Sequence, residues 1–477
     1  MMPEKQAALA AIEAKKELVC QVADSVWEYA ELSLQEYQSA ALYCRILLQE
    51  GFAVEEGICG IETAFSASYG SGRPVIGILA EYDALSGLSQ KGGGTRQEEL
   101  VPGGSGHGCG HNLLGAGALA AALGVKHYLE ASGKPGTVVL YGCPGEEGGA
   151  AKAFMARDGL WYGLDAALTW HPDDCNEVAT GSSNACIQVE YTFRGVAAHA
   201  AGCPEKGRSA LDAVELMNIG VQYLREHMDS RARVHYAVTD TGGRSPNVVQ
   251  AKASVLYMVR SDKVKKALEL QKRVDKIAEG AALMTQTICE RKFIDGLAET
   301  IPNHALEALL YENFSRIGVP GYTPEERDFA ARLLATYDTA DYLPGTGRED
   351  ADYAEQVRKL LPGGAMNDIL LPLYQGDAFC PGSTDVGDVS WQCPTAQIHV
   401  AAWPNGCPGH SWQNVSCGRT DIGRKAALCA GKVLCAAAID LLERPELLED
   451  ARGEFKKRTA EGYCCPIPPE AVPTVAE

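Results

Sequence analysis

The chain has 477 residues, 46% of them hydrophobic, which is enough for an extensive core and for more than one domain. Its formal charge of −19, from 62 acidic and 43 basic residues, argues against a nucleic-acid-binding protein, because such proteins gain affinity from lysine and arginine on phosphate. The same charge leaves small anionic substrates open, because one local arginine can outweigh the field of the whole protein.

The first residues and the cysteine content together indicate a compartment. Met1–Gln6 is polar, and the apolar run that follows is interrupted by charges from Glu13 onward, so we expect an amphipathic helix and no signal peptide. The longest uncharged apolar stretch, residues 113–125, is too short to span a bilayer. The 17 cysteines are therefore expected to be reduced thiols in a cytoplasmic protein that does not contact membranes.

Up to about residue 183, segments with strand and helix periodicity alternate. Residues 5–51 carry apolar side chains at helical spacing and predict two helices. The elements expected next are strands at Thr63–Tyr69 and Val75–Ala80, a helix at Leu113–Leu129 with Asn112 as its N-cap, and strands at Thr137–Tyr141 and Ala166–Trp170. This order predicts an α/β fold, with a mixed sheet covered by helices on both faces and polar residues at the carboxyl ends of its strands.

The pattern changes near Ser183. Ile187–Phe193 alternates with a period of two, as a half-exposed antiparallel strand does. The elements expected after it are a helix at Ala210–Met228, strands near Val234–Val238 and Ala253–Val259, and a helix at Lys263–Leu283. This β-α-β-β-α-β order predicts a ferredoxin-like α+β domain over residues 184–299. It is expected to be inserted into a discontinuous larger domain made of residues 1–183 and 300–477.

The second half of the larger domain is expected to be mainly helical. The expected elements are helices at Ala305–Ile317 and Pro324–Thr336, a long Gly/Pro-rich loop from Gly345 to Gly382, a strand at Ala396–Ala402, helices at Thr420–Leu442 and Pro445–Gly462, and a disordered tail after Pro466.

The most informative motif is Gly106–Asn112, which places Cys109 and His111 two residues apart between glycines. A Cys-x-His pair alone is weak, because a structural zinc site would need two further Cys or His nearby, and this region lacks them. Two later turns, marked by glycine or proline, contain a Glu-Glu pair and a Trp-His-Pro sequence. Thiolate, imidazole and carboxylate on such loops are the donor set of a metal site, and the sequence therefore predicts a metal-dependent hydrolase.

The Glu-Glu pair is Glu146 and Glu147. Adjacent carboxylates point in different directions, so one is expected to bind metal while its neighbour acts as a base. The alternative is a solvated acidic turn, which is the usual state of charged pairs. The pair follows a buried strand and lies between Pro-Gly and Gly-Gly, where backbone can approach closely, and this context favours the site.

Two further histidines occur at turns. His171 ends a predicted strand, where a histidine is more often a satisfied core residue, and His410 lies in a glycine turn. Both histidines could belong to one metal site, but neither position by itself requires such a site. His107 and His399 are interpreted as structural residues.

Together these residues resemble the metallo-amidohydrolase/carboxypeptidase family that contains aminoacylase, carboxypeptidase G and the auxin-conjugate and hippurate amidohydrolases. The similarity is closest to its aminobenzoyl-glutamate hydrolases of the B-subunit type and their dipeptidase-like relatives. The segments that carry it, in family order, are Gly77–Leu85, Gly106–Leu114, Tyr141–Gly149, Ala167–Pro172, His199–Ala201, Asn247–Arg260, Gly382–Trp391 and Pro408–Gln413.

The resemblance implies an amide hydrolase that cleaves an N-acyl amino acid such as p-aminobenzoyl-glutamate, by water activated on two divalent ions, zinc or manganese. The residues that match metal ligands are Cys109, His111, Glu147, His171 and His410. Glu146 matches the general base, and Asp83 matches an aspartate behind the site that would orient a ligand.

The resemblance also makes the inserted domain a lid and a dimerisation surface. His199 matches a histidine that, in family dimers, reaches the partner's active site and would stabilise the oxyanion. Asn247 and Arg260, with Ser383 and Thr384 of a later loop, match residues that hold the substrate's carboxylate. Arg260 could instead pair across the lid sheet, and His199 could cap the next helix. A homodimer is expected, and a heteromer with a paralogous subunit is the alternative.

The chain departs from the wider family in two places. Many members carry His-x-Asp after the strand before the first metal loop, whereas this chain has Glu81-Tyr82-Asp83 and so lacks that histidine. The auxin-conjugate type has Asp after Cys-Gly-His, where this chain has Asn112. A dipeptidase or N-acyl-amino-acid deacylase of the same family stays open, as does a non-catalytic partner or binding subunit. A thiol-redox protein would need a Cys-x-x-Cys motif, which the sequence does not contain.

Overall fold

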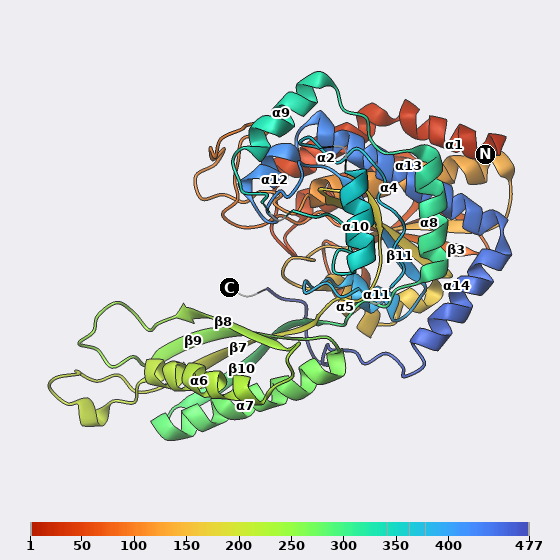
Figure 1. Ribbon diagram of the computed structural model, residues 1–477. Coiled ribbons are helices and arrows are strands. Elements are labelled where there is room, and N and C mark those ends of the chain that lie inside the picture. Colours follow the sequence, from red (N-terminus) through yellow and green to blue (C-terminus); the bar gives the residue numbers. More distant parts are fainter. Residues whose placement is uncertain (1, 341, 362, 377, 476–477) are drawn as a thin grey trace.

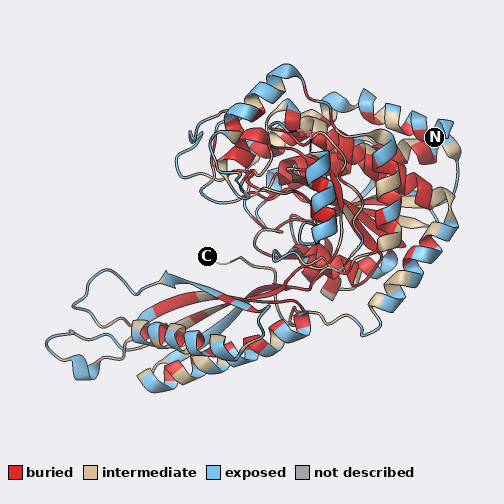
Figure 2. Ribbon diagram, viewed as in Figure 1, coloured by how far each residue is buried: buried red, intermediate tan, exposed pale blue. Residues whose placement is uncertain are grey.

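The computed structural model describes residues 2–340, 342–361, 363–376 and 378–475, which form two β-sheets with helices packed against them (Figure 1). The larger sheet and most of the helices make a rounded unit, and the smaller sheet with two helices projects from it as an elongated arm. Buried residues fill the interior of the rounded unit and continue along the sheet of the arm (Figure 2). Each unit therefore has its own core, and a third cluster that includes Cys186 and Leu297 joins the base of the arm to the rounded unit.

The larger sheet is mixed, as predicted. Its strands are β1 (Ala53–Glu56), β2 (Phe65–Ser71), β3 (Val75–Ala80), β4 (Gly136–Gly142), β5 (Ala166–Asp173), β6 (Glu177–Ala179) and β11 (Thr395–Ala401). They lie in the order β1-β2-β4-β3-β5-β11-β6. The pairs within β4-β3-β5-β11 are parallel, and the outer pairs are antiparallel. The parallel centre brings four carboxyl ends to one edge of the sheet.

Helices cover both faces of this sheet. They are α1 (Pro3–Ala14), α2 (Lys16–Tyr29), α3 (Tyr37–Gln49), α4 (His111–Ser132), α5 (Ala151–Arg157), α8 (His304–Ile317), α9 (Pro324–Leu334), α10 (Ala351–Leu360), α11 (Val386–Ser390), α12 (Trp412–Cys417), α13 (Asp421–Glu443) and α14 (Pro445–Arg458). Within β3, Ile76 and Ile78 pack into the core that contains α4 and α13, whereas Leu79 packs into the core that contains α5 and α11. A strand buried on both faces explains why β3 reads as a continuous apolar run.

The arm has the strand order of a β-α-β-β-α-β unit. Its elements are β7 (Ala185–Arg194), α6 (Ala210–Leu224), β8 (Arg233–Asp240), β9 (Lys252–Ser261), α7 (Val264–Thr285) and β10 (Ile288–Leu297). The sheet order is β10-β7-β9-β8, and all its pairs are antiparallel. This is the ferredoxin-like layout that the alternating strand and helix patterns predict.

Two linkers, residues 180–184 and 298–302, join the arm to the rounded unit. The hydroxyl groups of Ser183 and Thr300 lie 2.9 Å apart and tie the linkers together. A segment from the other end of the chain pairs with the first linker, since Ser182 N donates to Ala378 O and Asn184 N donates to Gly382 O, each at 2.9 Å. The residues that follow Gly382 are thereby attached to the base of the arm.

The N-terminal region differs from the prediction. Residues 3–49 form three helices where two were expected, because the chain breaks at Lys15, which ends α1 and precedes α2. Asn112 is not the N-cap of α4: that position is Gly110, and Asn112 lies in the first turn of the helix. Its side-chain amide donates to Ala23 O and Gly418 O at 3.1 and 3.0 Å, so its function is to tie α4 to α2 and to the end of α12.

Two segments expected to be irregular contain a helix or packing contacts among their described residues. The loop from Gly345 to Gly382 contains α10, whose first turn is capped by the Asp350 carboxylate and whose Tyr353 is buried. The helix has 10 residues and a clear helical periodicity, with Tyr353, Ala354 and Val357 buried on one side, but the glycines and prolines around it favoured a loop prediction. The tail after Pro466 packs on the rounded unit through buried Ile467, and Arg157 donates to Ala471 O. Among the described residues, no helix combines the length and the apolarity needed to cross a bilayer.

Candidate metal centre

The residues predicted to bind metal meet at the carboxyl edge of the parallel strands. Glu81 and Asp83 follow β3, Glu146 and Glu147 follow β4, His171 lies near the end of β5, and His410 lies in the loop between β11 and α12. Parallel strands place such residues side by side although they are far apart in the sequence.

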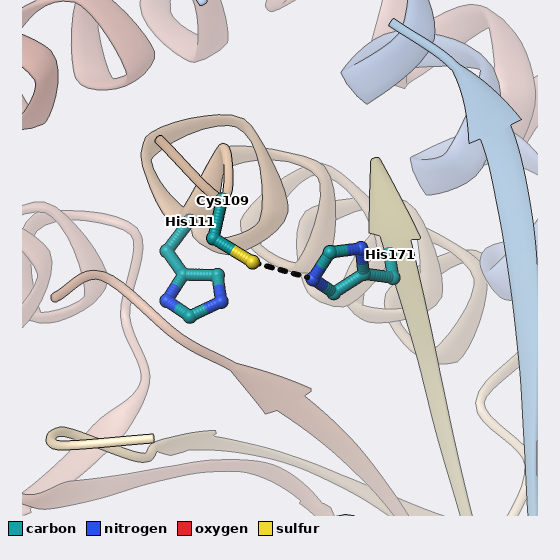
Figure 3. A group of neighbouring side chains, drawn as sticks. All are labelled: Cys109, His111 and His171. Atoms are coloured by element: carbon teal, nitrogen blue, oxygen red, sulfur yellow. Dashed lines mark hydrogen bonds between the residues drawn. The ribbon is translucent and has the colours of Figure 1, made fainter. Parts of the chain in front are cut away.

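Cys109 and His111 reach this edge from the turn that opens α4. Gly110 between them has a φ of +77°, and a side chain on it would meet the ring of Trp403 at 3.0 Å and Pro172 at 3.1 Å. Glycine is therefore required at this position both for the backbone conformation and for space. The turn brings the Cys109 sulfur and the His111 ring to the same side, with His171 opposite them (Figure 3).

His171 has its second ring nitrogen free to act as a ligand. Its Nδ1 lies 2.6 Å from Pro172 O, to which it would donate, while its Nε2 lies 3.3 Å from Cys109 Sγ (Figure 3). Burial, with the charge of neighbouring His111, lowers the pKa of His171 to about 4. A neutral imidazole whose lone pair faces a thiol is the form that binds a metal ion.

His111 is held from behind by Asp83. Asp83 Oδ1 lies 2.7 Å from His111 Nδ1, and Oδ2 accepts hydrogen bonds from Ser33 Oγ at 2.8 Å and Glu147 N at 2.9 Å. Although burial opposes its ionisation, His111 and these donors lower the pKa of Asp83 to about 2. The carboxylate thus fixes the ring so that Nε2 faces the site, which is the common arrangement behind a metal-binding histidine.

The remaining two predicted ligands also pair. His410 Nε2 lies 3.4 Å from Glu147 Oε1, and His410 has a φ of +52° just before Ser411, whose side chain begins α12 with a capping box. The donor atoms form two groups within 4.8 Å, one of Cys109, His111 and His171 and one of Cys109, Glu147 and His410. The Cys109 sulfur belongs to both groups.

The chemistry of this cluster suits divalent cations. His111 Nε2 and Glu147 Oε1 are buried and make no hydrogen bond of good geometry, although buried polar atoms normally have a partner. Burial and the neighbouring carboxylates raise the pKa values of Cys109, Glu146 and Glu147. More acids are gathered here than can ionise together without cations, and positive ions would relieve both the repulsion and the missing partners.

Glu146 lies within 4.8 Å of donor atoms of Glu81 and His111. It also lines a pocket of about 170 Å³ together with Cys109, Glu147, His171 and His410. Ser383 and Thr384 line the same pocket. The predicted base, four of the five predicted ligands and the two loop residues therefore line one space large enough for the reacting part of a small molecule.

Three functional neighbours were not assigned from the sequence. Glu81 takes part in the cluster, since its Oε2 lies 3.3 Å from His111 Nε2. Lys152 and Asp385 are fully buried beside it and form an ion pair. Glu81 was visible as a carboxylate at the end of a strand, but Lys152 gives no such signal, because lysines in helices are usually exposed.

The predicted site residues on the arm lie in different positions relative to the pocket. Arg260 on β9 donates from Nη1 to Ser383 Oγ at 2.8 Å, so it reaches the loop that lines the pocket. His199 and Asn247 are exposed, and Ala200 N donates to Asn247 O at 3.0 Å, so these two lie together on the arm. Neither lines the pocket within this protomer. The structure therefore brings Arg260 to the site of its own chain and leaves His199 and Asn247 outside it.

The two histidines interpreted as structural have internal partners. His107 Nε2 lies 2.9 Å from Val26 O. His399 Nδ1 lies 3.0 Å from Glu177 Oε1 and 3.2 Å from Asp173 Oδ2. Although burial opposes it, these carboxylates raise the pKa of His399 to about 9.

Comparisons with known proteins agree with this geometry. The family model described as Peptidase family M20/M25/M40 matches residues 77–358. The chain is 43% identical over 472 residues to the B-type subunit of p-aminobenzoyl-glutamate hydrolase from Escherichia coli (strain K12), covering 97% of each chain. It is 27% identical over 450 residues to Xaa-Arg dipeptidase of Mus musculus, covering 92% of this chain and 88% of the relative.

A solved structure supports the fold. The dinuclear metal-binding peptidase of the M20 family from Bacillus subtilis superimposes with a TM-score of 0.55 at 18% identity, covering 90% of this chain and 99% of the other. At this identity the likeness is one of architecture, with a mixed sheet flanked by helices.

Proposed function

Because the chain belongs to peptidase family M20/M25/M40 and is a hydrolase of amide bonds, we propose that it cleaves an N-acyl amino acid and that p-aminobenzoyl-glutamate is its substrate. The observation that carries the proposal is the convergence of Cys109, His111, Glu147, His171 and His410 beside Glu146 at one edge of the sheet. The 43% identity to one subunit of a p-aminobenzoyl-glutamate hydrolase over 97% of the chain supports the substrate.

We further propose that the five ligands hold two divalent ions, with the Cys109 sulfur between the two donor groups to which it belongs. Such ions, when bound, would supply Lewis-acid polarisation of the scissile carbonyl and of the attacking water. A thiolate ligand favours zinc and the carboxylates tolerate manganese, so these are the two metals proposed.

The chain's own residues would then move the proton. A carboxylate oxygen of Glu146 would accept the proton of the attacking water and deliver it to the departing amine nitrogen. Asp83 keeps the His111 ring in the orientation that leaves Nε2 facing the site. Glu146 and Glu147 would thereby divide two tasks, base and ligand, because only Glu147 belongs to a donor group with Cys109 and His410.

Arg260 and the loop at Ser383 and Thr384 would hold the free carboxylate of the substrate. Arg260 Nε is buried without a hydrogen-bond partner, while Nη1 already contacts Ser383. An arginine with an unused donor beside a polar loop suits a carboxylate. Asn247 would join this end of the substrate from the arm of the partner subunit, because it does not reach the pocket of its own chain.

The acyl group would occupy a second cavity of about 210 Å³ that adjoins the first, since both are lined by Ser383, Thr384, Val386 and Gln397. Its other walls include Ala179, Ile301, Pro302 and Ala396, and its described lining residues include no lysine or arginine. Most of its lining surface is apolar, although Glu307 and His399 also line it, and such a cavity suits an aryl group that carries a polar substituent. The substrate would therefore be oriented with its carboxylate at Arg260, which contacts Ser383, and its acyl group in the second cavity, which Ser383 also lines.

Purified enzyme is expected to hydrolyse p-aminobenzoyl-glutamate with a larger kcat/KM than N-acetyl-glutamate, because only the aryl group fills the second cavity. Activity should disappear after treatment with a chelator and return with zinc or manganese. Release of the free amino acid, quantified for each substrate, measures the preference, and the absorbance of released p-aminobenzoate follows the effect of the chelator and of added metal. Equal rates for the two acyl groups would contradict the assignment of the cavity, and full activity in metal-free protein would contradict the mechanism.

A dipeptidase is the second candidate, favoured by the relationship to two Xaa-Arg dipeptidases at 27% and 26% identity. The same assay distinguishes it by including dipeptides that end in arginine. A preference for these over p-aminobenzoyl-glutamate would replace the first proposal. A non-catalytic binding subunit is not favoured, because every predicted ligand and the base stand in one cluster.

We also propose that residues 184–299 act as a lid and dimerisation domain over a catalytic domain of residues 1–183 and 300–477. Large apolar side chains on the arm are exposed, among them Tyr223 at 76%, Leu283 at 81% and Ile288 at 67%. Exposed apolar side chains of this size are compatible with a subunit interface on the arm. A homodimer is proposed first, and a heteromer with a related subunit second, since the bacterial relative is itself one subunit of a hydrolase.

All 17 cysteines of the described chain are free, which suits the proposed cytoplasmic location.

His199→Ala should abolish most turnover although the residue lies outside the pocket of its own chain, because it would act in the partner's site. Mixing it with the inactive Glu146→Gln variant tests this directly. Random dimers of the two would contain one intact site in each mixed pair, so about a quarter of wild-type activity should return. Activity in the mixture that equals the sum of the separate variants would contradict action across the interface.

A further inference from the structure

Lys152 is a charged residue in an unusual position. It lies in the first turn of α5, five residues after Glu147, and its side chain is 0% exposed. Its Nζ lies 2.8 Å from Glu81 Oε1 and also contacts Asp385 Oδ1. Its backbone N–H donates to Asp385 Oδ2 at 2.9 Å. One ammonium group therefore joins two buried carboxylates that come from segments about 300 residues apart in the chain.

The two carboxylates belong to different parts of the site. Glu81 Oε2 faces His111 Nε2 at 3.3 Å, and the carboxylate lies within 4.8 Å of donor atoms of His111 and Glu146. Asp385 directly follows Ser383 and Thr384, which line the pocket. Lys152 thus stands between the metal cluster on one side and the loop proposed to hold the substrate on the other.

The contacts with Lys152 fix the orientation of the Glu81 and Asp385 carboxylates. Glu81 Oε1 is occupied by Lys152, so only Oε2 is presented to the cluster. Asp385 receives both the side chain and the backbone N–H of Lys152, which anchors the residue immediately after the loop. Without the ammonium group, two buried carboxylates would face each other unpaired, and each would have to rotate or become protonated.

We propose that Lys152 is a positioning residue that holds Glu81 toward the metal-binding residues and Asp385 beneath the loop of Ser383 and Thr384, so that one side chain sets both metal affinity and substrate affinity. The part that concerns substrate rests on the function proposed above. The part that concerns metal does not, because it can be measured on the protein without substrate.

The test compares three single variants. Lys152→Met should weaken binding of Zn²⁺ or Mn²⁺ to metal-free protein about 10- to 100-fold, measured by calorimetric titration, and should raise KM for p-aminobenzoyl-glutamate. Glu81→Gln should reproduce the loss of metal affinity with little change in KM. Asp385→Asn should reproduce the rise in KM with little change in metal affinity. A purely structural role would lower the melting temperature and leave both constants of the folded protein unchanged.

Two further variants keep the result decisive. Lys126→Met is the matched control, since Lys126 also lies in a helix and pairs with Glu130 at 3.0 Å but is distant from the cluster. It should change neither constant. Lys152→Met combined with Asp385→Asn removes one charge of each sign and so protects folding if the single variant is unstable. It should still bind metal about 10-fold more weakly or worse, because Glu81 has lost its partner.

Wild-type metal affinity in the folded double variant, or in folded Lys152→Met, would overturn the proposal. Failure of the wild-type enzyme to cleave p-aminobenzoyl-glutamate would instead count against the proposed substrate, and the metal titrations would still decide the function of Lys152.

Discussion

Glu146→Gln is expected to reduce kcat about 1,000-fold while the protein still binds its metal ions. The amide keeps the size of the side chain but can no longer accept a proton from water or return one to the departing nitrogen. Glu146 is not in either donor group that contains Cys109, so its loss should leave those ligands in place. Steady-state rates and metal content by atomic emission measure the two parts separately.

The adjacent carboxylate provides the control. Glu147→Gln changes the same turn by the same chemistry, but Glu147 lies 3.4 Å from His410 and belongs to a donor group. This variant should lose metal as well as activity. If Glu146→Gln lost metal and Glu147→Gln kept it, the two assignments would have to be exchanged. If Glu146→Gln kept wild-type kcat, the base would be another group.

Cys109→Ser is expected to weaken metal binding about 100-fold or more, because the Cys109 sulfur is the donor shared by both groups. A hydroxyl is a much poorer ligand than a thiolate and stays protonated at neutral pH. The change should lower the metal stoichiometry, measured by calorimetric titration, and should lower activity in proportion. Added metal at high concentration should restore part of the rate, since the base and the substrate contacts are untouched.

The fold should survive this substitution. The Cys109 side chain contacts other site residues, His171 Nε2 at 3.3 Å among them, so its replacement by serine removes no core packing. Cys20→Ser, at a half-buried cysteine outside the site, is the control and should leave metal binding unchanged. Full metal affinity in Cys109→Ser would show that the sulfur is not a ligand. Loss of activity with full metal content would indicate a nucleophile instead.

Much of the secondary structure follows from local pattern. The apolar run at 75–80 and the alternation at 187–193 each predict a strand that the structure contains, because burial on two faces or on one face leaves a distinct periodicity. The errors occur where local signals are weak. Asn112 is a residue type that often caps helices, but its side-chain amide donates to Ala23 O and Gly418 O. The residues next to it in the sequence give no sign of these long-range contacts.

The candidate site shows the same division. Donor types are visible in the sequence because thiol, imidazole and carboxylate groups stand in glycine- or proline-marked turns after apolar strands, and this pattern predicts Cys109, His111 and Glu147 as ligands. The sequence does not show which donor atoms come close to one another. That Cys109 belongs to two groups depends on the parallel alignment of β3, β4, β5 and β11, which sets residues from four turns against one another.

The sequence by itself therefore determined the kinds of element, the kinds of ligand and the family resemblance, since each depends on residues close together in the chain. Only the tertiary structure decided that Lys152 lies between Glu81 and Asp385 and that Arg260 reaches Ser383. Lys152 and Asp385 are separated by 233 positions. A lysine can be buried when carboxylates from distant segments pair with it. The packing of the sheet and its helices brings those carboxylates together, and no local sequence pattern predicts this.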